Sequence, residues 1–444
     1  MATRADPAEA ADFLARFPET VRIHVLVPDT HGVFRGKWMP PDHLPALYEE
    51  GLSIAKSIYS LDIWGRDVFT TGLYEEIGDP DGVLLPIPGT LVPVPWSTQP
   101  AAQVTARLVE EDGTPFFGDP RTRLEAAASR IAERGLTPVA ATELEFMLLK
   151  ERNGVFEAVG DVSGPERQAI YGVDDLDMLE TFISDVEAAA RAQNVPADTV
   201  ISEAAAGQFE VNLKHGPDIA RVADEALLLK RIIIGIAARH GMRATFMPKP
   251  FHDRNGSGMH VHMSLVDTAG FNAFSGAEGE ALLSKAIAGL LTTMPEATAL
   301  FVPGVNGYRR MSATYAADRA LWAENNRYTA IRLPRAKAVA RRFEHRAAGA
   351  DANPFLVLAA ILGGVDEGIR NGLQPPPPVT GHIRHADGAP LPGSLAGALA
   401  ALESSAWAKQ VFGADYLTFF RRVKAQEADV FARHVSALER ETYL

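Results

Sequence analysis

Polar and apolar residues alternate most regularly between Gly258 and Leu265. His260, His262 and Ser264 fall on one face of an extended chain there, because successive side chains of a strand point to opposite sides. The other face carries the apolar side chains of Met259, Val261, Met263 and Leu265. The pattern predicts a strand with one face in a core and the other available for chemistry. A hairpin with two solvated histidines is the alternative reading.

Other stretches predict the remaining elements. Alternation predicts strands over residues 21–27, 101–110, 139–150, 208–214 and 244–247, and a turn with a returning strand over 29–37. Helical spacing with start and stop signals predicts helices over residues 8–17, 41–50, 121–134, 174–194 and 219–240. The density of proline and glycine from residue 78 to 96 predicts a long ordered loop. After the proline run at 375–378 the chain is predicted to be mainly helical.

The order of these elements predicts an α+β fold of two domains. Residues 1–108 form a small β-rich domain, and residues 109–444 form a larger domain that carries the polar strand faces. The sequence Glu111-Asp112-Gly113 marks the boundary.

Composition narrows the classes of function. The formal net charge of −13 disfavours nucleic-acid and anionic-membrane partners, which are bound mainly through lysine and arginine. The chain has no cysteine, so a metal site must use carboxylates and imidazoles. The N-terminus does not resemble a signal peptide, and the longest apolar run, residues 356–365, is about half of the ~20 residues that a membrane helix needs. A cytoplasmic protein is expected.

Carboxylates lie on the polar faces of two other predicted strands. Glu143 and Glu145 are two residues apart and share one face, where two like charges are unfavourable unless a cation lies between them. Glu203 and Glu210 supply two more acids close together in the chain. Each group taken alone is also compatible with a solvated strand. Together they favour a site for a hard divalent cation.

Arginines accumulate further along the chain. Arg342, Glu344 and Arg346 share a face of one predicted strand, which suits a metal site bridged by an anion or, alternatively, a structural ladder of ion pairs. Additional guanidinium groups, which match carboxylate and phosphate oxygens, come from Arg309, Arg310, Arg327 and Arg332. The combination favours metal-assisted chemistry on a phosphorylated nucleotide.

These residues resemble the glutamine synthetase family over nearly the whole chain. The motifs that carry the resemblance are Asn255-Gly256-Ser257-Gly258-Met259-His260-Val261-His262, Lys249-Pro250, the pair Glu143 and Glu145, Glu203 with Gly207-Gln208-Phe209-Glu210, Arg342-Phe343-Glu344, and Asn353-Pro354-Phe355. The resemblance implies an N-terminal β-grasp-like domain and a C-terminal catalytic domain with a curved antiparallel sheet. It also implies a homo-oligomer, a dodecamer of two hexameric rings with active sites between neighbouring subunits.

The resemblance further implies a role for each site residue. Glu145, Glu203 and Glu210 would bind one divalent cation, Mg²⁺ or Mn²⁺, and Glu143, His260 and Glu344 a second one. Asn255, Gly256, Arg310 and Arg346 would bind glutamate. His262, Ser264, Arg327, Arg332 and Arg342 would bind ATP, which is a co-substrate. Arg310, Arg327 and Asp62 would be the catalytic residues. The implied reaction is phosphoryl transfer from ATP to glutamate, followed by attack of an amine on the acyl phosphate.

Two positions bear on the identity of the amine. Family members that use ammonia have a glutamate where this chain has Ala316, and an aspartate in an N-terminal loop where Asp62 is at best an offset substitute. The N-terminal sequences resemble the gamma-glutamylputrescine and polyamine synthetase branch, so putrescine or a related amine is expected. The alternatives are glutamine synthetase proper, a non-catalytic family member, and a dinuclear metallohydrolase, which would not account for the arginines.

Overall fold

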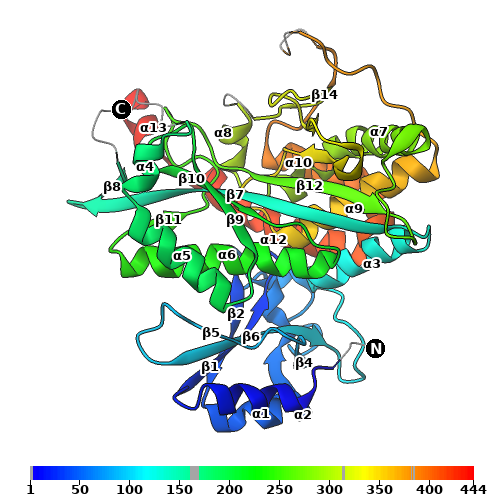
Figure 1. Ribbon diagram of the computed structural model, residues 1–444. Coiled ribbons are helices and arrows are strands. Elements are labelled where there is room, and N and C mark those ends of the chain that lie inside the picture. Colours follow the sequence, from blue (N-terminus) through cyan, green and yellow to red (C-terminus); the bar gives the residue numbers. More distant parts are fainter. Residues whose placement is uncertain (1–3, 161–169, 313–315, 382, 384–385) are drawn as a thin grey trace.

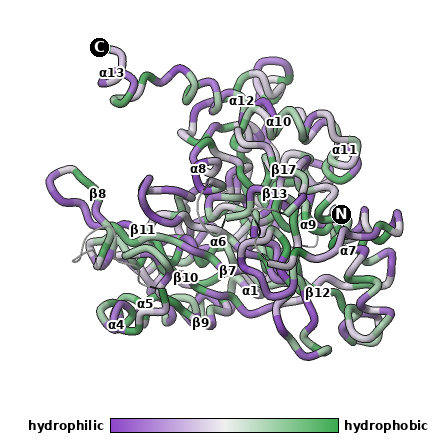
Figure 2. The backbone as a smooth tube through the Cα atoms, turned by 90° about the horizontal axis from the view of Figure 1, so that it is seen from above, coloured by the Kyte–Doolittle hydropathy of each residue, from purple (hydrophilic) through white to green (hydrophobic). Residues whose placement is uncertain are grey.

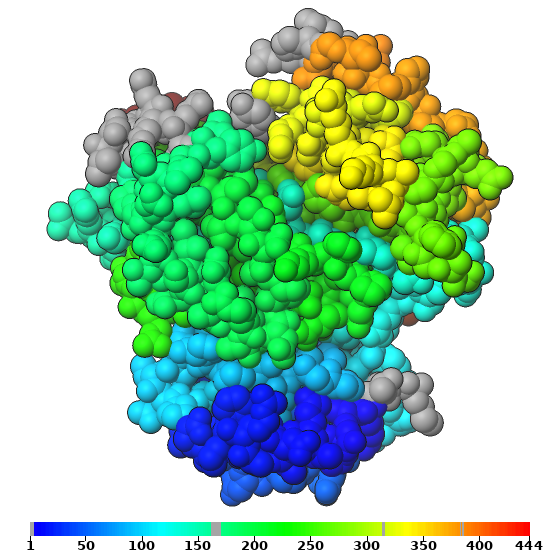
Figure 3. All heavy atoms as spheres, in the orientation of Figure 1, coloured from blue at the N-terminus to red at the C-terminus, as the bar shows by residue number. Residues whose placement is uncertain are grey.

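The computed structural model describes residues 4–160, 170–312, 316–381, 383 and 386–444. It contains two main sheets, one small and one large (Figure 1). The space-filling view shows a waist between the N-terminal part, in blue, and the rest of the molecule (Figure 3). Among the described residues, no helix is both long enough and apolar enough to cross a lipid bilayer.

The small sheet has the strand order β2-β1-β6-β4-β3, and β5 pairs with β6. Its strands are β1 (Arg22–Pro28), β2 (Phe34–Met39), β3 (Leu52–Ala55), β4 (Asp81–Pro86), β5 (Val92–Pro93) and β6 (Ala101–Val109). Strands β1 and β6 run parallel, and the other pairs are antiparallel. Helices α1 (Pro7–Arg16) and α2 (Leu44–Glu49) lie at the end of the molecule beneath this sheet (Figure 1).

The large sheet has the strand order β14-β15-β16-β12-β7-β10-β9, and β8 and β11 also pair with β7. Its strands are β7 (Thr137–Arg152), β8 (Val155–Ala158), β9 (Ala197–Ser202), β10 (Gln208–Leu213), β11 (Arg243–Thr245), β12 (Met259–Val266), β14 (Trp322–Glu324), β15 (Ile331–Leu333) and β16 (Phe343–His345). All of its pairs except β14 with β15 are antiparallel. The prediction of an α+β fold with a mainly antiparallel second sheet is confirmed.

Helices cover the apolar face of the large sheet and form the core behind it (Figures 1 and 2). The helices of this larger part, not all of which lie against the sheet, are α3 (Pro120–Ala132), α4 (Val173–Asp177), α5 (Glu180–Ala192), α6 (Ile219–Arg239), α7 (Gly276–Phe301), α8 (Gly307–Met311), α9 (Pro354–Arg370), α10 (Leu395–Ser404), α11 (Ala406–Phe412), α12 (Ala414–Arg433) and α13 (Ala437–Tyr443). A two-stranded ribbon joins β13 (Arg319–Ala320) to β17 (Ala389–Pro390). Figure 2 shows that the β8 hairpin and α13 project from the body.

Side chains near the starts of α9 and α3 link these helices to other segments of the chain. The Asn353 side chain caps α9 by accepting a hydrogen bond from the Phe355 amide, and its amide group donates to the Asp29 and Thr30 carbonyls in the N-terminal part of the chain. Arg121 of α3 forms a buried ion pair with Asp224 of α6. These contacts join the start of α9 to the loop after β1, and α3 to α6.

Two element predictions were wrong. The stretch 78–96 was expected to be a loop, but β4 and β5 lie within it. The proline and glycine residues there bound the apolar run Val83-Leu84-Leu85, which pairs with both β3 and β6. The single helix expected over 174–194 is two helices, because the backbone at Leu179 leaves the helical conformation (φ −112°, ψ 13°).

Candidate active site

Strand register places the acids and histidines in one row across the large sheet. Glu143 of β7 lies opposite His260 of β12 on one side and Asn212 of β10 on the other. On the same face, Glu145 lies opposite Glu210 of β10. Directly opposed residues of antiparallel strands have Cβ atoms about 5 Å apart, so β7, β10 and β12, three separate segments of the chain, bring their polar side chains together.

The outer edge of this row is formed by β16. Glu344 lies opposite His262 of β12 and opposite Arg332 of β15. Arg332 Nη1 lies 2.6 Å from Glu344 Oε2, and Arg346 pairs with the other carboxylate oxygen. Arg342 was expected to flank Glu344, but its Nε donates instead to His262 Nδ1, at 3.1 Å.

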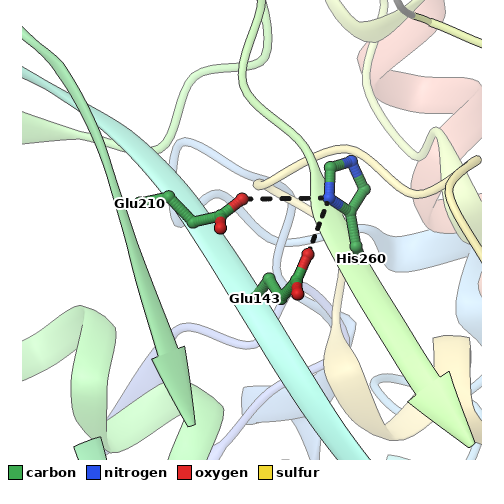
Figure 4. Close-up of side chains that lie close together, drawn as sticks. All are labelled: Glu143, Glu210 and His260. Carbon is green, nitrogen blue, oxygen red and sulfur yellow. Dashed lines mark hydrogen bonds and ion pairs between the residues drawn. The ribbon is translucent and has the colours of Figure 1, made fainter. Parts of the chain in front are cut away.

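Three groups of side chains could each hold a metal ion. Within each group, every side chain offers one ligand atom, and these atoms lie within 4.8 Å of one another. The groups are Glu145, Glu203 and Glu210; Glu143, Glu210 and His260; and Glu143, His262 and Glu344. Figure 4 shows the second group, in which His260 Nδ1 is 3.3 Å from Glu143 Oε2 and 3.9 Å from Glu210 Oε2. The first group has the same members as one expected ligand set.

The second expected set is arranged differently. His260 Nδ1 lies 3.9 Å from Glu344 Oε1, whereas His262 Nε2 lies 2.8 Å from Glu143 Oε1. His262, which the resemblance assigns to the nucleotide, therefore also lies among the candidate metal ligands.

The carboxylates repel one another in a buried place. Burial raises the pKa of Glu210 well above its usual value, and Glu143 and Glu145 raise it further. Burial and the neighbouring Glu203 raise the pKa of Glu145 to about 7. Buried carboxylates without enough positive charge nearby are unfavourable when ionised. This group of glutamates is therefore suited to a bound cation.

Two neighbouring glutamates, Glu143 and Glu344, instead have lowered pKa values, because hydrogen bonds and guanidinium groups stabilise their ionised forms. Burial alone would raise the pKa of Glu143, but hydrogen bonds with His260 and His262 bring it well below its usual value. Burial would likewise raise that of Glu344, but the positive charge of Arg346 outweighs it and lowers this pKa to about 2. Burial lowers the pKa of His260 to about 4, which leaves a neutral imidazole able to bind a metal.

The loop before β12 is fixed to the sheet by hydrogen bonds. The Gly258 amide donates to Glu145 Oε2 at 2.7 Å, and Gln208 Nε2 donates to the Gly256 carbonyl at 3.0 Å. A Cβ atom on Gly256 would lie 2.4 Å from the Pro248 carbonyl oxygen, and one on Gly258 would lie 2.3 Å from Arg310 Nη2. Glycine is therefore required at both positions for the loop and Arg310 to approach so closely.

The row of carboxylates opens into a cavity of about 640 Å³. Of the residues predicted from sequence, it is lined by Glu143, Glu145, Glu203, Glu210, Asn255, Gly256, His260, His262, Arg310, Ala316, Arg327, Arg332, Arg342 and Arg346. Glu344 is fully buried beneath this lining. Ser264 lies further along β12 and is not part of the lining. Residues 313–315, which precede Ala316 in the expected amine segment, lie outside the described residues.

Asp62 lies away from this cavity. Its buried carboxylate accepts hydrogen bonds from the amides of Trp64 and Arg66, from Arg66 Nε, and from Gln426 Nε2 of α12. Within this chain it fixes the loop 61–67 against α12.

Several lining residues were not found from the sequence. They are Ile170, Tyr171, Ile201, Ala204, Gln208, Asn212, Asn325, Pro334 and Arg335. Gln208 stood in a quoted motif without a role, and Asn325, with a positive φ of 50°, lies in a turn whose position no local pattern indicates.

The chain was compared with known proteins. The family model for the glutamine synthetase catalytic domain matches residues 117–443. The chain is 37% identical to gamma-glutamylputrescine synthetase PuuA of Escherichia coli (strain K12), over 98% of this chain and 94% of that protein. It is 31% identical to glutamate–isopropylamine ligase of Pseudomonas sp, over 96% and 95% of the two chains. A solved structure described as apo GmaS without ligand superimposes with a TM-score of 0.85 and 27% identity, covering 97% of this chain and 98% of that one.

Proposed function

The chain belongs to the glutamine synthetase family, and from this premise we propose that it is an ATP-dependent ligase that joins glutamate to an amine. The amide forms at the side-chain carboxylate of glutamate through a γ-glutamyl phosphate. Putrescine or a related polyamine or monoamine is the proposed amine. The similarity to an enzyme named for putrescine and to another named for isopropylamine supports this substrate class.

One observation carries the proposal: acids and guanidinium groups line the same cavity. Glu145, Glu203 and Glu210 lie on one side of it, whereas Arg327 and Arg332 add positive charge to its lining. Transfer of a phosphoryl group between two anions requires that their charge be neutralised at fixed positions. A cavity with arginines alone, or acids alone, would not meet this need.

The residues present fit divalent cations. Glu145, Glu203 and Glu210 would hold one ion, and Glu143, His260 and Glu344, with His262 adjacent, would hold a second. Carboxylate oxygens with one imidazole are ligands suited to Mg²⁺ or Mn²⁺. When bound, the ions neutralise phosphate oxygens and orient the transferred group.

The remaining residues bind and orient the two anionic substrates. Arg310, which is buried and fixed by the Ala347 and Arg346 carbonyls, lies beside the Gly256–Gly258 loop and is proposed to bind glutamate with Asn255 and Arg346. His262, Ser264, Arg327, Arg332 and Arg342 are proposed to contact ATP, with Arg327 and Arg310 as catalytic cations.

The chemistry balances without an external oxidant or reductant. A γ-carboxylate oxygen of glutamate attacks the terminal phosphorus of ATP, and ADP leaves. The neutral amine then attacks the acyl carbon, phosphate leaves with that carboxylate oxygen, and the new amide nitrogen loses a proton. Ala316 lines the cavity at the position aligned with the glutamate of ammonia-using members, which supports a carbon-bearing amine.

We also propose that residues 1–108 and 109–444 act as separate domains and that the protein forms a dodecamer of two hexameric rings. In such an assembly the loop around Asp62 would face a neighbouring active site. The exposure of Trp38, Trp64 and Phe69 on the N-terminal part supports burial of this surface by another subunit.

The proposal is tested by measuring ADP release with glutamate, Mg²⁺ and ATP in the presence of putrescine, isopropylamine or ammonium, with mass spectrometry of the product. We expect a γ-glutamyl amide, with an organic amine preferred over ammonium. Ammonium as the best substrate would indicate glutamine synthetase proper. Absence of turnover with every amine would support a non-catalytic family member.

A further inference from the structure

A second cavity, of about 220 Å³, shares no lining residue with the candidate active site. Its walls come from the N-terminal part of the chain (Thr30 and Ile63), from the segments 247–248 and 303–306, from the start of α9, and from α12. It is smaller than the ~300–1,000 Å³ typical of sites for drug-sized ligands, and is therefore suited to a molecule of a few heavy atoms.

Most of the cavity wall is apolar. Leu300, Leu356 and Phe420 form its buried part, and Ile63 and Phe431, each 46% exposed, lie at its rim. The buried charges of α12 are already paired: Lys424 Nζ lies 3.0 Å from Glu427 Oε2, and the other oxygen of Glu427 accepts a hydrogen bond from the Ile63 amide. These two charges offset each other.

Asp351 is the exception among the charged groups of this wall. Its carboxylate receives no hydrogen bond from another described residue and forms no ion pair with one. It lies between two glycines, since a Cβ atom on Gly304 would be 3.1 Å from Oδ2 and one on Gly349 would be 2.6 Å from Oδ1. Burial raises the pKa of Asp351 to about 6, although Lys230 and Lys424 act in the opposite direction at longer range. The Asp351 side chain as a whole is half-buried, but its Oδ1 is fully buried. A buried carboxylate oxygen without a partner is unfavourable unless a cation compensates it.

We infer that this cavity is a second ligand site, which takes a small organic ammonium ion whose cation pairs with Asp351 and whose apolar group contacts Leu300, Leu356 and Phe420. An inorganic cation would leave the apolar wall without a partner, and a neutral apolar molecule would leave the carboxylate unpaired. The site is separate from the proposed catalytic cavity and does not depend on the proposed reaction.

The site also adjoins the support of the glutamate loop. The Pro248 carbonyl accepts a hydrogen bond from the Ser257 amide at 2.8 Å. The Asn306 side chain accepts from the Lys249 amide at 2.8 Å and donates to the Lys249 carbonyl at 3.0 Å. Because Pro248 and Asn306 also line the second cavity, a ligand there contacts residues that hold this loop.

The test uses benzylammonium as the probe and benzyl alcohol, which has the same shape without the charge, as its neutral match. Crystals of the full chain soaked with benzylammonium should show the ring in the cavity and the nitrogen within hydrogen-bond distance of Asp351. Calorimetric titration should show binding that weakens tenfold or more for benzyl alcohol and for the Asp351→Asn variant, because a charge-assisted contact is lost in both.

Three further variants separate this site from others. Val305→Phe fills the cavity while retaining Asp351, and should abolish the same binding. Asp366→Asn changes a buried acid of α9 that is paired with Arg134 outside the cavity. This variant should bind benzylammonium as tightly as the unchanged chain. Glu203→Gln changes the catalytic cavity and should also leave this binding unchanged, so failure of the proposed reaction and failure of this site are distinguishable. The inference is overturned if Asp351→Asn binds benzylammonium as tightly as the unchanged chain, or if the cavity holds only water or a segment of another subunit in soaked crystals.

Discussion

Replacement of Glu145 by glutamine removes one carboxylate from the repelling group in the active site. Burial and Glu203 raise the pKa of Glu145 from 4.5 to about 7. At about 1.36 kcal/mol for each pKa unit, this difference makes ionised Glu145 destabilise the cation-free folded protein by about 3 kcal/mol at pH 8. The folded-state pKa lies above the unfolded-state value, so the folded protein holds the extra proton and its free energy of unfolding falls as pH rises from about 4.5 through about 7.

The assay is urea denaturation followed by tryptophan fluorescence, in the presence of a chelator and at constant subunit concentration, at about pH 5 and about pH 8. We expect the unchanged chain to lose roughly 2 to 3 kcal/mol more than Glu145→Gln between these pH values. Glu157→Gln, on the exposed strand β8 that pairs with the same β7, is the matched control and should behave as the unchanged chain. Saturating Mg²⁺ should remove the difference in pH dependence, because a bound cation pairs with the ionised carboxylate. Identical pH dependence in the unchanged chain and Glu145→Gln without metal would refute the reasoning.

Further changes have expected outcomes in activity or stability. Chelation should reduce ADP release to background and added Mg²⁺ or Mn²⁺ should restore it, whereas activity that survives chelation would contradict the metal assignment. Arg346→Gln removes the ion pair with Glu344 and should lower kcat/KM for glutamate by about 100-fold, and an unchanged value would exclude a role for this arginine. Ala316→Glu should raise kcat/KM for ammonium and lower it for larger amines by about tenfold each, which an amine panel measures, and an unchanged preference would show that residue 316 does not select the amine. Arg121→Leu leaves Asp224 buried without its partner and should lower the free energy of unfolding by about 3 to 5 kcal/mol, a loss that replacing both residues by leucine should reduce.

Local sequence patterns predicted the strands that carry the chemistry. The two-residue period of β7 and β12 fixes which side chains share a face, so Glu143, Glu145, His260 and His262 could be placed on polar faces before the structure was known. Helices α3 and α6 have strong capping residues and apolar spacing, and their predicted bounds differ from the observed ones by at most two residues.

Long-range pairing could not be predicted in the same way. Strands β13 to β15 have only two or three residues each, which is too short for a two-residue period to be recognised. Glu344 pairs with Arg332 rather than with Arg342. This choice depends on how β15 and β16 align. Asp62 illustrates a second limit, because a carboxylate that completes a turn and one that reaches a substrate are indistinguishable in a sequence.

Labelling the side-chain carboxylate of glutamate with ¹⁸O tests the central claim most directly. If the enzyme forms γ-glutamyl phosphate, mass spectrometry should find one ¹⁸O in the released phosphate and one in the amide product, for each amide formed with putrescine or another accepted amine. Release of phosphate without ¹⁸O would show that ATP is hydrolysed by water, and would contradict the proposed ligase reaction.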